Sequence, residues 1–257
     1  MSNVSALANS KRIVLKVGSS SITNGNEKNL QLIADFAKRM QQAGKELVVV
    51  SSGAIATAAP LLGLTIKSDD LPTSQALASI GQAMLMGRYE RALSPHGIIP
   101  GQILLTVDNL EQSHTAQNAL LALERLLEVG VLPIINENDS VATSEIRFGD
   151  NDQLAAKVAK LLGADLLILL SDVDSLYTKP PGEPGAERLA VVPADFDLES
   201  IQVSGTSTGY GTGGAVTKLV AARLATMAGI GVLLTESSNI ATLDAKEITH
   251  TWFEPAV

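Results

Sequence analysis

The chain has 257 residues, of which 46% are hydrophobic and 18% are charged, and its formal net charge is −8. Such an acidic chain has no general attraction to nucleic acid or anionic membranes, so any phosphate site must be local. The sequence has no cysteine, which excludes disulfide and thiol chemistry, and it shows neither a secretory signal nor a long apolar span. We therefore expect a cytoplasmic protein with a sizeable core.

The N-terminal part predicts a tail followed by a strand. Residues 1–10 are small and polar, and we expect a flexible tail before a single domain over residues 11–257. The first strand is predicted over Arg12–Gly18, with Lys16 near its end and Ser19–Ser21 directly after it. A Gly/Ser turn after a parallel strand exposes N–H groups that suit phosphate. A lone lysine at a strand end, however, is usually just solvated.

A second turn of this kind follows the next predicted strand. Apolar residues at helical spacing predict a helix over residues 28–43, and an apolar run predicts a strand over Glu46–Ser52. That strand ends in Ser51–Gly53. This sequence is typical of an ordinary strand-to-helix turn and equally of a second anion-binding turn at the same edge of the sheet.

The middle of the chain continues this alternation. Helices are predicted over residues 72–94 and 113–129, and a strand is predicted between them over Ile98–Thr106. Gly81 and Gly87 interrupt the first of these helices mildly. The alternation of strands and helices favours an α/β fold with a mainly parallel sheet.

Two polar clusters flank the loop between the next predicted strand and helix. A strand over Val131–Ile135 runs directly into Asn136–Asp139, and Asp150–Asp152 precede an apolar helical pattern. Aspartate and asparagine are common turn and cap residues, but two clusters at the carboxyl edge of a sheet favour a binding site. An EF-hand is excluded, because the sixth and twelfth positions counted from Asp150 are alanine and leucine.

The last third adds another strand end and a glycine-rich segment. A strand over Asp165–Asp172 ends in Ser171 and Asp172, and residues 178–188 predict an exposed loop. Residues 203–213 lead into a helix over residues 214–228, which carries Lys218 in its first turns. Two further strands are predicted, over residues 229–235 and 248–252.

The glycine-rich segment is not a dinucleotide fingerprint. Gly209–Gly214 fits G-x-G-x-x-G, but it follows a polar loop late in the chain instead of a strand in the first βαβ unit. The segment is either a mobile loop or a loop whose backbone approaches phosphates. With no P-loop, no visible G-x-S-x-G elbow and no metal-ligand spacing of histidines, what remains is phosphate handling by Lys16 and Lys218.

These motifs, in this order, resemble the amino-acid kinase family. The segments that carry the resemblance are Lys16–Ser20, Ser51–Ile55, Gln102–Thr106, Ile135–Thr143, Gly149–Asp152, Ser171–Asp172 and Gly211–Lys218. The INEND and GDND sequences are specific, whereas KVG alone is not. Four departures keep the chemical class: Ser51 and Ser171 stand where threonine is common, Arg147 where lysine is common, and Ala-Val where Met-Ser is usual before Thr217.

The resemblance implies an open αβα sandwich with a central, mainly parallel sheet. It also implies ATP-dependent phosphorylation of the side-chain carboxylate of L-glutamate to L-glutamyl 5-phosphate, the first step of proline synthesis, with feedback inhibition by proline. Many members continue into a PUA domain beyond the point where this chain ends, and we expect inhibition to survive without it. A sister kinase with another acceptor, or a nucleotide-binding protein without catalysis, are the alternatives.

The resemblance also implies the site residues. Catalysis is assigned to Lys16, Lys218, Asp152 and Asp150, and glutamate binding to Ser52, Asp139, Asn151 and Asn136. ATP binding is assigned to Lys16, Gly18, Ser171, Asp172, Thr212, Gly213, Gly214, Ala215, Val216, Thr217 and Lys218. Mg²⁺ is expected mostly on phosphates and water, without dedicated protein ligands. We expect a homo-oligomer, a dimer or a tetramer, that passes its product to the next enzyme of the proline pathway.

Overall fold

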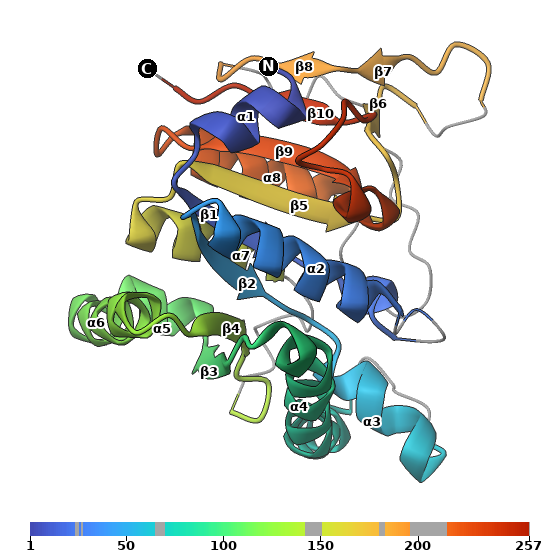
Figure 1. Ribbon diagram of the computed structural model, residues 1–257. Coiled ribbons are helices and arrows are strands. Elements are labelled where there is room, and N and C mark those ends of the chain that lie inside the picture. Colours follow the sequence, from blue (N-terminus) through green and yellow to red (C-terminus); the bar gives the residue numbers. More distant parts are fainter. Residues whose placement is uncertain are drawn as a thin grey trace.

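A computed structural model describes residues 1–23, 26, 28–64, 70–141, 151–179, 183–195 and 215–256 (Figure 1). A central sheet of eight strands runs in the order β3-β4-β2-β1-β5-β9-β10-β8. Its strands are β1 (Arg12–Lys16), β2 (Glu46–Val50), β3 (Pro100–Leu105), β4 (Leu132–Glu137), β5 (Leu166–Ser171), β8 (Val191–Val192), β9 (Gly231–Glu236) and β10 (Thr251–Phe253). All neighbours pair in parallel except β9 and β10. A separate antiparallel pair joins β6 (Leu176–Tyr177) to β7 (Arg188–Leu189).

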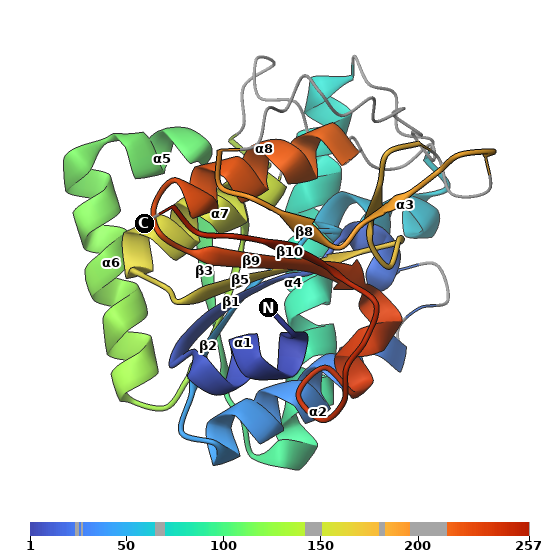
Figure 2. The same cartoon turned by 90° about the horizontal axis from the view of Figure 1, so that it is seen from above.

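Helices cover both faces of this sheet (Figure 2). One face packs against α1 (Asn3–Asn9), α2 (Lys28–Gln42) and α4 (Leu71–Leu93). The other packs against α6 (Ser113–Glu128), α7 (Asn151–Leu162) and α8 (Ala215–Thr226). The predicted αβα sandwich with a mainly parallel sheet is thus confirmed. Among the described residues, no helix combines the length and the apolar character needed to cross a membrane.

The central strands contain continuous apolar runs because they are buried on both sides. In β1, Ile13 and Leu15 face the layer of α1, α2 and α4, whereas Val14 faces the layer of α6, α7 and α8. In β5, Ile168 and Leu169 divide in the same way. Burial of both faces is the rule for parallel sheets, and it explains why continuous apolar runs predicted these strands.

Residues 1–10, for which we expect a flexible tail, contain a helix. Residues Asn3–Asn9 form α1, and the Ser2 side chain caps its start. The Asn3 side chain is fully buried, and its Nδ2 donates to the carbonyl oxygens of Leu243 at 2.7 Å and Lys246 at 2.8 Å. A short polar sequence gave no sign of this helix, because the groups that hold it lie near the other end of the chain.

Two further short α-helices of the described structure were not predicted. The helix α3 (Ala54–Leu62) follows β2, and α5 (Val107–Glu111) follows β3. At the start of α3, Gly53 has a φ of 98°, and a Cβ there would lie 3.4 Å from the Cα of Ser19. A left-handed glycine therefore lets the turn after β2 pack directly on the turn after β1.

Candidate active site

Four neighbouring strands end where the predicted site residues lie. The strands β4, β2, β1 and β5 are adjacent and parallel, so their carboxyl ends reach the same edge. Lys16 is the last residue of β1, Asn136 lies near the end of β4, and Ser171 ends β5. This edge is where open α/β sheets bind ligands.

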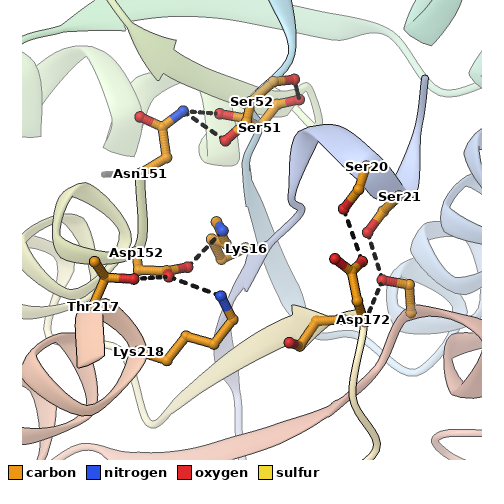
Figure 3. Close-up of polar contacts among 12 residues, drawn as sticks. Lys16, Ser20, Ser21, Ser51, Ser52, Asn151, Asp152, Asp172, Thr217 and Lys218 are labelled. Atoms are coloured by element: carbon orange, nitrogen blue, oxygen red, sulfur yellow. Dashed lines mark hydrogen bonds and ion pairs between the residues drawn. The ribbon is translucent and has the colours of Figure 1, made fainter. Parts of the chain in front are cut away.

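A buried carboxylate holds two lysines at this edge. Lys16 Nζ lies 2.5 Å from Asp152 Oδ1, and Lys218 Nζ lies 3.2 Å from Asp152 Oδ2 (Figure 3). The Thr217 hydroxyl donates to the same Oδ2 at 3.0 Å. The exposed fractions of Lys16, Asp152 and Lys218 are 5%, 1% and 8%. The strand β1 and the first turns of α7 and α8 thus bring two cations to one anion.

The electrostatics of this cluster favour an anionic ligand. Burial alone would raise the pKa of Asp152, but the ammonium groups of Lys16 and Lys218 outweigh it and hold that pKa at about 2. Burial lowers the pKa of Lys218, and the nearby charge of Lys16 lowers it further, against the attraction of Asp152. With both lysines protonated, the three side chains carry a net charge of +1, which an anion compensates.

Next to the charged cluster lies a group of neutral amides and hydroxyls. Asn151 Nδ2 donates to the carbonyl oxygen of Ser51 at 2.6 Å, to Ser52 Oγ at 2.9 Å and to Asn136 Oδ1 at 2.8 Å. Figure 3 shows the Asn151 amide turned towards the two serines. Asn136 and Asn151 are almost completely buried. The first residue of α7 is thereby fixed to the ends of β2 and β4.

The Gly/Ser turn after β1 is tied to the ends of β5 and β9. Ser20 Oγ donates to Asp172 Oδ1 at 2.8 Å, and the hydroxyls of Ser21 and Ser237 are 2.5 Å apart. Ser237 Oγ also donates to the carbonyl oxygen of Ser171 at 3.0 Å. These hydrogen bonds fix the conformation of the Gly/Ser turn, whose composition suits phosphate binding.

The remaining predicted residues divide into described and undescribed ones. Asp139 follows β4 by two residues and is half-buried, and burial raises its pKa to about 6. A Cβ at Gly18 would lie 3.8 Å from Lys16 Nζ, so this backbone borders the ammonium group. Ala215 begins α8, and the Val216 side chain is exposed. Four predicted residues lie outside the described part of the chain: Asp150, Thr212, Gly213 and Gly214.

In the described structure, three side chains that the sequence analysis did not name contact Asn136, Ser51 or Ser171. Asn136 Nδ2 donates to Gln82 Oε1 at 2.7 Å, and the hydroxyls of Tyr89 and Ser51 are 2.9 Å apart. The third is Ser237, described above. Gln82 and Tyr89 are seven residues apart in α4, so they lie on one face of that helix. This face meets the ends of β2 and β4.

A glycine next to Gln82 explains how α4 reaches the site. A Cβ at Gly81 would lie only 1.8 Å from the carbonyl oxygen of Ala54, the first residue of α3. No other residue permits this approach. Glycine inside a helix costs about 1 kcal/mol relative to alanine, so a glycine in mid-helix is itself a sequence signal of a close contact.

No group of three or more histidine, aspartate or glutamate side chains suited to a metal ion occurs within the described ranges. Two of the described acidic residues of the site bind other protein groups: Asp152 contacts the two lysines, and Asp172 accepts from Ser20. The arrangement provides cations, amides and hydroxyls for an anionic ligand.

The sequence matches the model of the amino acid kinase family over residues 11–236. The chain belongs to this family. It is 52% identical to the glutamate 5-kinase of Clavibacter michiganensis subsp. michiganensis over 97% of this chain and 96% of that protein. It is 47% identical to the glutamate 5-kinase of Streptomyces avermitilis over 97% of this chain and 68% of that longer protein.

Two solved structures share the fold at low sequence identity. The carbamate kinase from Giardia lamblia bound to AMP-PNP has a TM-score of 0.68 and 15% identity, covering 97% of this chain and 100% of that one. The UMP kinase from Ureaplasma parvum has a TM-score of 0.64 and 16% identity, covering 95% of this chain and 98% of that one. These likenesses concern the fold alone.

Proposed function

We propose that this protein uses ATP to phosphorylate the side-chain carboxylate of L-glutamate, giving L-glutamyl 5-phosphate and ADP in the first step of proline synthesis. The observation that carries the proposal is the contact of Lys16 and Lys218 with one buried carboxylate, Asp152, next to a cluster of amides. The similarity to curated glutamate 5-kinases over nearly the whole chain supports the choice of substrate.

The reaction needs positioning and charge compensation more than acid–base catalysis. A glutamate side chain with a pKa of about 4.3 is already ionised at neutral pH, so no base has to remove a proton. One carboxylate oxygen attacks the γ-phosphorus of ATP, the bond from that phosphorus to the β–γ bridging oxygen breaks, and the electron pair leaves with ADP. The obstacle is the approach of an anion to a polyanion, which buried ammonium groups relieve.

The roles of the residues follow from this chemistry. Lys16 and Lys218 bind oxygens of the transferring phosphoryl group, and Asp152 holds both ammonium groups in place. Glutamate binds next to them: Asp139 attracts its ammonium group, and Ser52, Asn151 and Asn136 provide hydrogen bonds, with Asp150 close by. On the other side, ATP binds along Gly18, Ser171, Asp172 and the segment from Thr212 to Lys218.

Magnesium fits this site as a partner of the substrate. Mg²⁺ keeps several waters and is commonly bound through one or two carboxylates and the phosphates of the nucleotide. Bound with ATP, it would neutralise charge on the phosphate oxygens, and Lys16 and Lys218 would bind the same oxygens. An assembly of two or four chains, a cytoplasmic location and transfer of the product to the next enzyme of the pathway belong to the same proposal.

ADP release from Mg-ATP, with and without L-glutamate, tests the proposal. Hydroxylamine in the same reaction traps an acyl phosphate as a hydroxamate, which separates carboxylate phosphorylation from simple ATP hydrolysis. We expect ADP and hydroxamate to form in equal amounts and only with glutamate. Equal turnover with aspartate or N-acetylglutamate would instead indicate another member of the family, and ATP binding without turnover would indicate a binding protein.

Proline inhibition is tested in the same assay. Free proline shares the α-carboxylate and ammonium groups of glutamate, so we expect it to raise the KM for glutamate while leaving kcat unchanged. Glutamate kinetics that do not change at millimolar proline would remove this part of the proposal.

A further inference from the structure

Gln82 takes part in an amide chain whose orientation is fixed from the backbone. Asn151 Nδ2 donates to the carbonyl oxygen of Ser51, and Asn136 Oδ1 accepts from the backbone N–H of Glu137 at 2.9 Å. A carbonyl can only accept and an N–H can only donate, so neither amide can be flipped. The nitrogen of Asn136 must therefore point at Gln82, where it donates to Oε1 at 2.7 Å.

This chain leaves one donor and one acceptor without partners. Gln82 Nε2 and Asn151 Oδ1 are both buried, and neither has a hydrogen-bond partner among the residues that the structure describes. Buried polar groups are nearly always paired, so two such atoms in one connected cluster call for an explanation. A ligand that brings an acceptor to Gln82 and a donor to Asn151 provides one.

The head group of an α-amino acid has this combination of groups. Its carboxylate accepts hydrogen bonds, and its ammonium group, next to the carboxylate, donates them. Because the orientations of the amides are fixed, the free group of Gln82 is a donor, Nε2. A ligand that placed its own donor there would not fit. The inference rests on the proposed function, since glutamate is such a molecule.

The position of Gln82 beside the end of β4 assigns it to the head group and not to the reacting carboxylate. Asn136 lies near the end of β4 and Lys16 ends β1, and β2 lies between these two strands. Neighbouring strands lie about 4.8 Å apart, so the amide chain and the lysines are separated by roughly 10 Å across the edge. A glutamate whose side chain reaches the lysines has its α-carboxylate on the side of β4 and α4.

We infer that Gln82 is a specificity-determining residue of the amino-acid site. Its Oε1 accepts the hydrogen bond from Asn136, whose orientation the backbone fixes, while its Nε2 donates a hydrogen bond to the α-carboxylate of the substrate. Gly81 and Tyr89 keep this face of α4 in place, through the close approach to α3 and the hydrogen bond to Ser51. Gln82 Oε1 contacts Asn136, whereas the two lysines contact Asp152.

The first test replaces Gln82 by methionine, which has a similar shape and no hydrogen-bonding amide. We expect Gln82→Met to raise the KM for glutamate about 10- to 100-fold, the range for loss of a hydrogen bond to a charged group. We expect kcat to change less than about threefold and the KM for ATP to stay the same, because the lysine cluster is untouched. The matched control is Gln117→Met on the exposed side of α6.

A substrate analogue separates recognition of the carboxylate from a general disturbance of the site. Isoglutamine is glutamate with its α-carboxylate replaced by an amide. The wild-type enzyme should strongly prefer glutamate to isoglutamine. Gln82→Met should reduce this preference, because it lacks the Nε2 donor that binds the charged α-carboxylate. A variant with a raised KM and an unchanged preference would overturn the role of Nε2.

Gln82→Glu provides a second variant. It keeps an oxygen for Asn136 Nδ2 but places a carboxylate where the α-carboxylate must bind, so its KM for glutamate should exceed that of Gln82→Met. The shift in melting temperature caused by glutamate should shrink in both variants, whereas the shift caused by Mg-ATP should not. A folded variant of either kind with a KM within twofold of the wild type overturns the inference. A wild-type enzyme without glutamate-dependent turnover overturns the proposed function itself.

Discussion

Replacing Asp152 by asparagine keeps the shape of the side chain and removes the charge that the two lysines share. The neighbouring ammonium groups hold the pKa of Asp152 at about 2, against an ordinary value of 3.8. A difference of about two units corresponds to roughly 2–3 kcal/mol, at 1.36 kcal/mol per unit. Asparagine resembles the neutral form of the carboxyl group, so we expect Asp152→Asn to lower the free energy of unfolding by about this amount at pH 7.

The pH dependence has a definite sign. The pKa of Asp152 is lower in the folded protein than in the unfolded chain, so the stabilisation is complete well above pH 3.8 and is lost as the pH falls towards 2. At pH 7 the whole effect is present. In a domain of this size, it corresponds to a fall in melting temperature of roughly 5–10 °C. Urea unfolding and thermal melts at pH 7 measure it, with Asp108→Asn on the exposed surface of α5 as the control.

The same variant tests the proposed catalytic role. Without the carboxylate, the lysines are no longer held in position, and we expect kcat to fall by a factor on the order of 10² or more. Mg-ATP should raise the melting temperature of Asp152→Asn more than that of the wild type, because the nucleotide restores negative charge between Lys16 and Lys218. A variant that unfolds like the wild type and keeps a near-normal kcat would refute the account of the cluster.

Three further predictions concern the same edge of the sheet. Lys16→Ala and Lys218→Ala should each lower kcat on the order of 10²-fold with a smaller change in KM, which steady-state kinetics of the folded variants measure. The arginine variants should also have a low kcat, because a planar guanidinium does not replace a compact ammonium group. Burial raises the pKa of Asp139 to about 6, so kcat/KM for glutamate should fall as the pH drops below 6, and a pH profile of Asp139→Asn should lack this limb. Gly81→Ala should lower the free energy of unfolding by about 1–3 kcal/mol or more, because the added Cβ would clash with a backbone oxygen of α3. Gly87→Ala is the control, since a Cβ there lies an ordinary 3.4 Å from the nearest side-chain atom. An unchanged urea midpoint in Gly81→Ala would contradict this packing.

The sheet was predictable because its signals are local. Strands buried on both faces read as continuous apolar runs, and helices such as α2 show a clear apolar stripe with Gly44 at the end. The helices α1, α3 and α5 have five to nine residues each, too few for a periodic pattern to emerge. The burial of Asn3 depends on carbonyl groups some 240 residues away, so the local sequence does not predict it.

The site was predictable to the extent that its residues form runs. The clusters around Asn136 and Asp152 stand out because several polar residues follow an apolar strand or begin a helix. Gln82 belongs to no run of polar residues, and an isolated glutamine in a helix is typical of a solvent-exposed face. Its place in the site depends on the close approach at Gly81, which is a property of two packed helices and not of either sequence alone.

The order of the strands also suggests how the proposed enzyme distinguishes glutamate from aspartate. The amide chain that would bind the head group lies at the ends of β4 and β2, and the lysines that would bind the phosphoryl group meet at the end of β1. An aspartate held by its head group is shorter by one carbon–carbon bond, about 1.5 Å, and its carboxylate stops short of the γ-phosphate. Since a misplacement of about 1 Å can cost on the order of 10² in rate, the discrimination belongs mainly in kcat. Aspartate should therefore compete with glutamate for the site while being phosphorylated poorly, because one rigid edge fixes both ends of the substrate.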